Sequence, residues 1–197
     1  MKNISKFVLV LLIAACAMPA FQSCKKGDND PGISFKSRKS RLVGEWNVTK
    51  GKLTQTSGGS VATMTYDGSS YSVTSGGTTT TGTYTFEYSI LKDGKYTSKE
   101  TRTVAGATTS YSYEGFWYFL DANKNLQAKN KERVAFQCTK YTYTSGTTTT
   151  IQTYTGDNPD EYYLDELKGK EMIWKRSLSA TGGSTTTIDY EYTLTLK

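Results

Sequence analysis

The chain has 197 residues, of which 36% are hydrophobic, and it carries 24 lysines and arginines against 18 aspartates and glutamates. It contains no histidine, the side chain most often used as a general base or metal ligand. This excludes a Ser-His-Asp or Cys-His nucleophile, so we expect a protein that is not an enzyme and needs no cofactor or metal ion. The basic residues form no long stripe of the kind that nucleic-acid binders show, and we expect no nucleic-acid partner.

The N-terminal segment has the pattern of a secretory signal. Lys2 and Lys6 precede an uninterrupted apolar run over residues 7–15. This run is too short for a membrane span, which needs about 20 apolar residues, and it fits the hydrophobic part of a signal peptide. Two cysteines follow, Cys16 and Cys24, and the pattern predicts export with a lipid attached to one of them.

The residues around the two cysteines favour different sites. Ile-Ala-Ala before Cys16 gives the better apolar-small-small-Cys pattern, whereas Cys24 precedes the charged segment 25–32 (KKGDNDPG). That segment resembles the tether after the lipidated cysteine in lipoproteins of the Bacteroidota, where such residues accompany export to the cell surface. We predict Cys24 as the lipidation site, with Cys16 as the alternative, residues 1–23 as signal peptide and residues 24–32 as a flexible tether. The resemblance implies lipid anchoring at the outer membrane, with surface exposure left open.

Signal cleavage leaves one domain over residues 33–197, which is long enough for a hydrophobic core. Loss of Lys2 and Lys6 leaves 22 basic against 18 acidic residues, a net charge of +4. With Cys24 acylated, Cys138 has no partner for an internal disulfide. Its alternation with Val134 and Phe136 predicts a small core-facing side chain and not a reactive thiol.

A short helix is expected first. Residues 33–41 (ISFKSRKSR) predict one or two helical turns with Ile33 and Phe35 as apolar anchors. The basic cluster Lys36–Arg41 is interpreted as a solvated or lipid-headgroup-facing surface and not as a binding site for nucleic acid.

Apolar and polar residues then alternate with the period of two that is typical of half-buried strands. The inward-facing sets are Tyr84, Phe86, Tyr88 and Ile90; Tyr111, Tyr113, Gly115, Trp117 and Phe119; Met172, Trp174, Arg176 and Leu178; and Ile188, Tyr190, Tyr192, Leu194 and Leu196. Asp-Gly and Gly-Gly pairs between the runs predict tight hairpins. These signals predict an all-β protein, an antiparallel up-and-down barrel of about eight to ten strands with a short N-terminal helix, because closure removes strand edges. A sandwich is the alternative.

Two local features leave alternatives open. Threonine runs at Thr78–Thr81, Thr147–Thr150 and Thr185–Thr187 adjoin Gly-rich turns. We interpret them either as soluble strand ends or as an adhesive, glycan-contacting surface on long hairpins.

Segment 159–168 is ambiguous between helix and strand. The acidic residues around it do not have the spacing of an EF-hand loop, so we expect a solvated loop that starts a helix and no metal site; they are Asp157, Asp160, Glu161, Asp165 and Glu166.

The segment 42–48 (LVGEWNV) resembles the Gly-x-Trp first strand of lipocalins and of bacterial lipocalin-like lipoproteins. Segments 84–96, 115–127 and 163–174 resemble later hairpins of that group, so the resemblance covers about residues 33–197. It implies a lipocalin-like barrel, open at one end, in which Gly44 permits close chain approach and Trp46 plugs the closed end. In true lipocalins a late basic residue stacks over that tryptophan, and Arg176 is the nearest match.

The chain has fifteen tyrosines and three tryptophans, which allows two interpretations. The rings fill a thin barrel, or they line a ligand cavity. The cavity hypothesis adds to Trp46 five inward-facing candidates, Tyr88, Tyr113, Trp117, Trp174 and Tyr192. The family resemblance then implies a lipid-anchored cell-envelope protein that binds a small hydrophobic or amphipathic ligand. The alternative is a non-catalytic structural protein that contacts glycans or an envelope partner through its Thr-rich hairpins.

Overall fold

The computed structural model describes residues 29–31, 34, 36–155, 158–180 and 186–197. The predicted signal peptide and both Cys16 and Cys24 lie outside these residues. Helix α2 (Arg38–Leu42) comes first and strands follow to the C-terminus. The strands are β1 (Gly44–Ser57), β2 (Ser60–Tyr66), β3 (Ser70–Ser75), β4 (Thr78–Ile90), β5 (Lys95–Val104), β6 (Ala107–Phe119), β7 (Arg133–Ser145), β8 (Thr148–Thr153), β9 (Asp160–Leu167), β10 (Glu171–Ala180) and β11 (Thr186–Leu196).

The strands form a closed antiparallel barrel, as the sequence predicted. Neighbours in sequence pair from β1 to β7, β9 continues the ring from β7 through β10 to β11, and β11 pairs with β1. The ring has ten strands, and β8 extends from the far half of β7, where Lys140 to Ser145 pair with it. The prediction of an all-β, up-and-down barrel with a short helix at its N-terminal side is confirmed.

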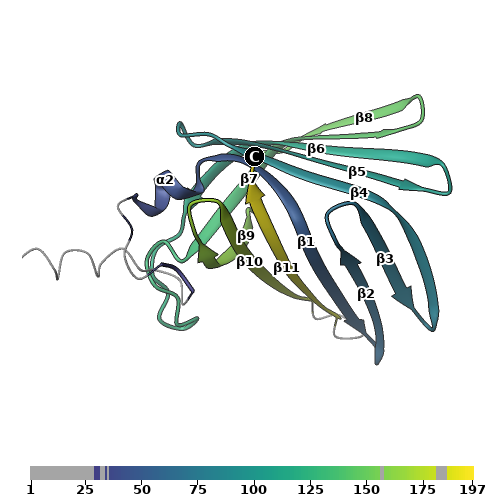
Figure 1. Ribbon diagram of the computed structural model, residues 1–197, viewed down its shortest axis with the longest axis horizontal. Coiled ribbons are helices and arrows are strands. Elements are labelled where there is room, and N and C mark those ends of the chain that lie inside the picture. The colour runs from purple at the N-terminus through teal and green to yellow at the C-terminus, as the bar shows by residue number, and fades with distance from the viewer. Residues whose placement is uncertain (1–28, 32–33, 35, 156–157, 181–185) are drawn as a thin grey trace, which may run out of the picture.

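The two ends of the barrel differ in width. Near α2, β1 pairs directly with β4, with Trp46 opposite Tyr88. Further along, a register shift between Val48 and Lys50 bends β1, and the β2–β3 hairpin enters between β1 and β4. We call the end at α2 the closed end and the opposite end, where the strands spread apart, the open end (Figure 1).

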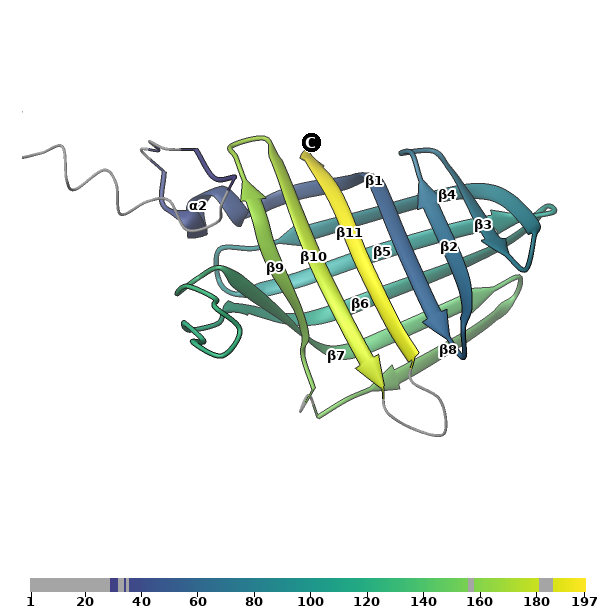
Figure 2. The same cartoon turned by 90° about the horizontal axis from the view of Figure 1, so that it is seen from below.

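A seam also opens toward the open end. In the described part of the chain, β10 pairs with β9 only as far as Lys175, and β8 pairs only with β7. The layer of β9, β10, β11 and β1 therefore diverges from the layer of β4 to β8, and the two layers cross in Figure 2.

Helix α2 begins later than expected, and its basic residues are placed differently from the prediction. The side chain of Ser37 caps it by accepting a hydrogen bond from the Ser40 amide. Arg38 and Arg41 are buried and both pair with the buried Asp30, at 3.0 and 3.3 Å. The prediction of a solvated cluster is therefore wrong for these two arginines, because a carboxylate on the preceding segment compensates their charge. The expected anchors Ile33 and Phe35 lie outside the described residues.

The acidic segment around residue 160 is a strand and not the start of a helix. Asp160 to Tyr163 pair with β7, and Tyr163 to Leu167 pair with β10. Tyr162 and Leu164 point into the core while their neighbours face outward. The segment forms a strand because hydrogen bonding to β7 on one edge and to β10 on the other outweighs its local helical pattern. Among the described residues, no cluster of three or more Cys, Asp or Glu side chains is placed to hold a metal ion.

The Thr-rich runs lie in the far halves of the hairpins. Thr78–Thr81 belong to β4 and Thr148–Thr150 to β8, and both sets are exposed. Hydroxyls pair across the strands, Thr74 with Thr79 at 2.9 Å and Thr144 with Thr149 at 3.2 Å. The third run begins at Thr185, outside the described residues.

Candidate functional site

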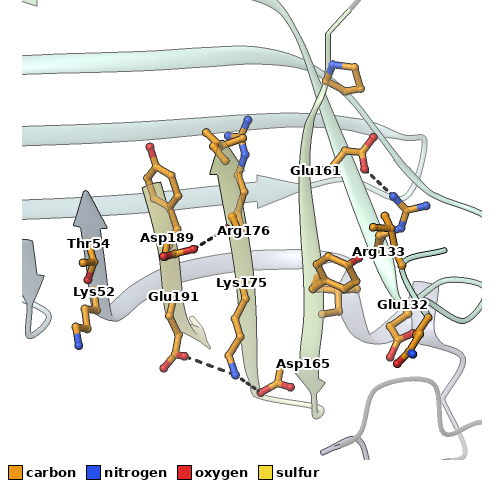
Figure 3. Close-up of a pocket in the computed structure, with 18 residues that line it drawn as sticks. Lys52, Thr54, Glu132, Arg133, Glu161, Asp165, Lys175, Arg176, Asp189 and Glu191 are labelled. Carbon is orange, nitrogen blue, oxygen red and sulfur yellow. Dashed lines mark hydrogen bonds and ion pairs between the residues drawn. The ribbon is translucent and has the colours of Figure 1, made fainter. Parts of the chain in front are cut away.

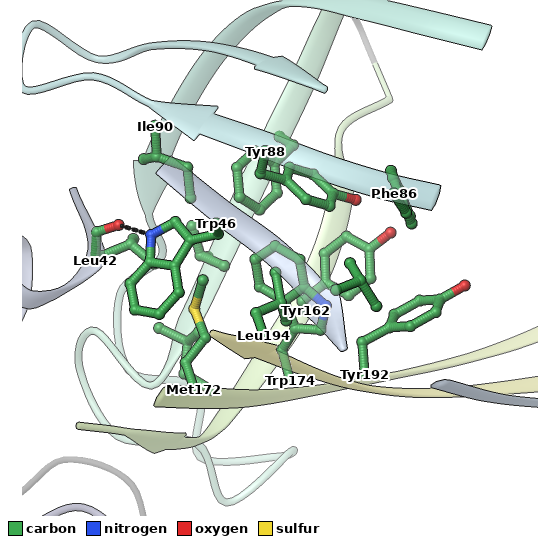
Figure 4. Close-up of a cluster of buried hydrophobic side chains, with 14 of the residues drawn as sticks. Leu42, Trp46, Phe86, Tyr88, Ile90, Tyr162, Met172, Trp174, Tyr192 and Leu194 are labelled. Carbon is green, nitrogen blue, oxygen red and sulfur yellow. Dashed lines mark hydrogen bonds between the residues drawn. The ribbon is translucent and has the colours of Figure 1, made fainter. Parts of the chain in front are cut away.

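The Gly-x-Trp segment lies at the closed end. Trp46 is fully buried, and its indole nitrogen donates a hydrogen bond of 2.9 Å to the carbonyl of Leu42 in α2. A Cβ added at Gly44 would overlap the Leu196 side chain, so only glycine fits there without a shift of its neighbour. Helix, first strand and last strand therefore meet around the indole and leave that end of the barrel filled (Figure 4).

Arg176 does not stack over Trp46 as the resemblance implied. It pairs with Tyr190 on β11, six residues from Leu196, the partner of Trp46. Its guanidinium lies 5.5 Å from the Tyr162 ring and 2.6 Å from the Asp160 carboxylate. Arg176 thus belongs to the middle of the barrel.

A layer of aromatic rings covers the plug. Trp174 stacks on Tyr162 at 5.0 Å and meets the edges of Tyr88 and Phe136 at 4.9 and 5.4 Å. Such contacts add about 0.5–1.5 kcal/mol each beyond burial. The Trp174 indole nitrogen is buried and has no hydrogen-bond partner among the described residues. Figure 4 shows the hydroxyls of Tyr88 and Tyr192 pointing away from Leu42 and Trp46, toward the open end.

Above this layer the interior is hollow. A cavity of about 220 Å³ is enclosed mainly by aromatic rings and a few polar side chains. Its lining comprises Phe86, Tyr88, Tyr96, Ser98, Glu100, Tyr113, Phe136, Asp160, Tyr162, Arg176, Tyr190 and Tyr192.

The structure brings three of the five predicted ligand-binding candidates together. Tyr88, Tyr113 and Tyr192 line the cavity. Trp174 lies one layer below it in the filled core. Trp117 lies toward the closed end, where its indole nitrogen donates to the Leu91 carbonyl at 2.8 Å.

Sequence reasoning missed the polar part of the lining. Ser98 and Glu100 follow Tyr96 at alternate positions of β5, all three on the inner face. Period-two alternation from Tyr96 was the available signal. A pattern of apolar residues does not select Ser98 and Glu100, because their side chains are polar.

The charged groups of the cavity form ion pairs, and Glu100 is also largely desolvated. Glu100 forms an ion pair of 3.0 Å with Arg102, and Asp160 pairs with Arg176. Burial raises the pKa of Glu100 above its usual value, although the positive charge of Arg102 opposes this. Burial, followed by the charge of Asp160, raises the pKa of Tyr162 to about 12. At neutral pH the cavity therefore presents tyrosine hydroxyls together with two ion pairs, of which Asp160–Arg176 has its carboxylate about half exposed.

A second hollow of about 610 Å³ adjoins this cavity near the open seam. It shares Tyr113 and Asp160 with the first and adds Tyr141, Tyr154 and Cys138. The Cys138 thiol donates to the Lys140 carbonyl at 3.3 Å, and burial raises its pKa. Cys138 therefore lies at the wall of this hollow in its thiol form, half-buried and facing inward.

A third hollow lies along β9, β10, β11 and β1 and has a different character (Figure 3). Outward-facing side chains of these strands line it together with Arg176 and Tyr190, which also line the inner cavity. The third hollow measures about 1090 Å³, but the charged side chains that line it form ion pairs with one another. Lys175 pairs with Asp165 at 3.0 Å and with Glu191 at 3.6 Å, and Arg133 pairs with Glu161 at 2.8 Å. The acidic and basic side chains of this hollow pair with one another, so the inner cavity is the better candidate for a ligand.

Fold and cavity together define a closed antiparallel β-barrel with an aromatic interior hollow. Within its described part, the chain has no helix long and apolar enough to cross a membrane. Comparison with protein-family models, curated proteins and solved structures finds no match for this chain.

Proposed function

We propose that the protein is a lipid-anchored cell-envelope binding protein whose barrel takes a small amphipathic ligand. The observation that carries the proposal is that the inner cavity and the hollow at the seam lie side by side, with Tyr113 and Asp160 in the lining of both. Alone, about 220 Å³ is less than the roughly 300–1,000 Å³ of most small-molecule sites. With the adjoining 610 Å³ the space falls within that range.

The lining defines the chemistry of the ligand. Ring faces of Phe86, Phe136 and the inner tyrosines suit an apolar or aromatic body. Tyrosine hydroxyls and the guanidinium of Arg176 suit a hydrogen-bonding or anionic group at one end. Both cavity carboxylates already pair with arginines, which supports binding and not catalysis as the role of the cavity.

Filling the cavity tests the proposal. Ser98 is 5% exposed and lines it, whereas its neighbour Thr97 on the opposite face of β5 is exposed. Ser98→Leu should weaken binding of the dye anilinonaphthalene sulfonate at least about tenfold, because each added carbon takes cavity volume, and Thr97→Leu should leave it unchanged. Fluorescence titration measures both. Equal affinities for the two variants would contradict a ligand site in the barrel.

The anchor is tested separately. Metabolic labelling with an acyl probe should label the wild-type chain and a Cys16→Ser variant, and Cys24→Ser should lose the label. Retained label on Cys24→Ser would place the lipid elsewhere. Native mass spectrometry of the protein from its own host then looks for a small molecule that stays with the barrel.

A second candidate is a structural protein that contacts glycans or an envelope partner through its hairpins. The exposure of the Thr-rich strand halves, with their tips at Gly77 and Gly146, favours it. Shortening these two hairpins should then abolish glycan retention while the barrel stays folded. The comparable tip at Gly183 lies outside the described residues. Binding that survives the deletions would exclude this role.

A further inference from the structure

Positive charge is concentrated at the closed end. Ten exposed lysines lie on or just before α2, on the turns and the loop at this end, or at the C-terminus. They are Lys36, Lys39, Lys92, Lys95, Lys124, Lys129, Lys131, Lys168, Lys170 and Lys197. The same segments contain four carboxylates, Asp93, Asp121, Glu132 and Glu171. Three of the ten lysines form ion pairs, Lys95 with Asp93, Lys168 with Glu166 and Lys197 with Glu87.

The turns at the open end carry no charge at all in the part of the chain that the structure describes. They read Ser-Gly-Gly-Ser at 57–60, Ser-Gly-Gly-Thr at 75–78, Val-Ala-Gly-Ala at 104–107 and Ser-Gly-Thr-Thr at 145–148. Charge is therefore separated along the barrel, with lysines at one end and hydroxyls and glycines at the other.

The lysine-bearing segments lie together around α2. The Lys39 ammonium lies 5.7 Å from the Trp117 ring, and Trp117 bonds to Leu91 of the β4–β5 turn. The amide of Leu196 donates to the Lys170 carbonyl, which joins the last strand to the β9–β10 turn. Figure 1 shows α2, these turns and the C-terminus on the same side of the molecule. We call this surface the lysine face.

Exposed apolar side chains lie on the lysine face and on the adjoining end of β6. Leu91 is 44% exposed in the β4–β5 turn, and Leu126 is 53% exposed in the loop before β7. Phe116 and Tyr118 are exposed on either side of Trp117, at 49% and 41%. Lysines interspersed with exposed leucines and aromatic rings are the composition of surfaces that lie in the membrane interface.

The N-terminal segment also enters the barrel here. The Asn29 amide donates to the Asp165 carbonyl at 3.2 Å, and Asp30 accepts from the Leu167 amide at 2.8 Å. Cys24 lies five residues before Asn29, a span of at most about 18 Å in an extended chain. A lipid on Cys24 would thus hold the lysine face close to the bilayer.

We propose that the lysine face docks on an anionic membrane surface, with its leucines at the headgroup level and the open end of the barrel turned away. The orientation rests on the proposed lipid anchor, whereas the affinity for anionic lipid rests on the lysines and leucines alone. Charge attraction of this kind acts over about a Debye length of 10 Å at 0.1 M salt. The attraction therefore acts at short range, once diffusion or the anchor has brought the face close to the membrane.

Vesicle binding by the unacylated full chain tests the docking. The vesicles are phosphatidylcholine, alone or with about one third phosphatidylglycerol to supply the negative surface potential. Lys92, Lys124 and Lys170 are changed together to Glu in the test variant. Lys50, Lys52 and Lys99, exposed lysines on the barrel wall, are changed to Glu in the control, which alters net charge equally. All variants share the same N-terminal 28 residues.

The closed-end variant should bind anionic vesicles at least about tenfold more weakly than the wall variant, with no difference on phosphatidylcholine alone. Leu91→Ser with Leu126→Ser should also weaken anionic binding, as judged by sedimentation. Equal losses in the two charge variants would show that net charge alone matters and would overturn the proposal. Binding to heparin with the same lysine dependence, but without any effect of the leucines, would assign the face to an acidic polymer and overturn it as well. Because the chain carries no lipid in this assay and the cavity is not involved, its result is independent of the acylation and dye-binding tests.

Discussion

Asp30 is expected to control the stability of the closed end. It is completely buried and faces Arg38 and Arg41, whose side chains are 3% and 2% exposed. It also accepts the Leu167 amide. Asp30→Asn keeps the shape and an acceptor oxygen but removes the only charge that the structure shows within ion-pair distance of Arg38 among the described residues.

The expected loss follows from the burial of the pair. Removing one partner of a buried ion pair costs about 3–5 kcal/mol, because the remaining charge stays in a low-dielectric site. The matched control is Asp93→Asn, whose pair with Lys95 is 3.6 Å long and more than half exposed on both sides. Such a pair contributes about 0–1 kcal/mol.

Denaturant unfolding followed by tryptophan fluorescence measures both variants. Since Trp46 is bonded to the last residue of α2, detachment of the helix should also move its emission to longer wavelength. A loss for Asp30→Asn no larger than that for Asp93→Asn would refute the reasoning. It would mean that water reaches Arg38 as soon as the carboxylate charge is gone.

Two further predictions concern the barrel wall. The raised pKa of Glu100 means that the native state holds this proton more tightly than the unfolded chain, so its contribution to stability falls as pH rises above about 4.5. Glu100→Gln should therefore gain stability relative to wild type between pH 4 and pH 7, as measured by denaturant titration at each pH; a constant difference would contradict the burial of the charge. A Cβ at Gly115 would overlap the backbone of Gln137 across the β6–β7 pair, whereas Gly169 has open space around it. Gly115→Ala should lower the free energy of unfolding by about 1–3 kcal/mol, and Gly169→Ala should lower it by much less. Similar thermal unfolding curves for the two variants would disprove the close approach of Gly115 to the Gln137 backbone.

The sequence predicted strands such as β4 well because they bury a single face. The alternation of Tyr84, Phe86, Tyr88 and Ile90 corresponds directly to the buried positions of β4. Closure of the ring was inferred from the number of hairpins and from the Gly-x-Trp segment. The direct pairing of Trp46 with Tyr88 depends on a register that no local pattern encodes.

What sequence could not supply were partners far apart in the chain. Arg38 appeared solvated because the carbonyl it bonds, that of Leu164, lies 126 residues away. The acidic segment appeared helical because its pairing with β7 and β10 is a property of the assembled sheet. The cavity lining was partly predictable, but whether rings fill or surround a space depends on the width of the barrel. That width is set by the topology.

The β2–β3 hairpin sets this width. Eight strands surround the filled end, and the hairpin adds two more toward the open end. Two strand spacings of about 4.8 Å lengthen the perimeter by about 10 Å and the diameter by about 3 Å. The barrel is therefore a cone, in which side chains of the same size meet at the apex and fall short of one another at the base. Seen this way, the hollow is a property of the backbone, so inner tyrosines can be exchanged for other residues without losing the space itself.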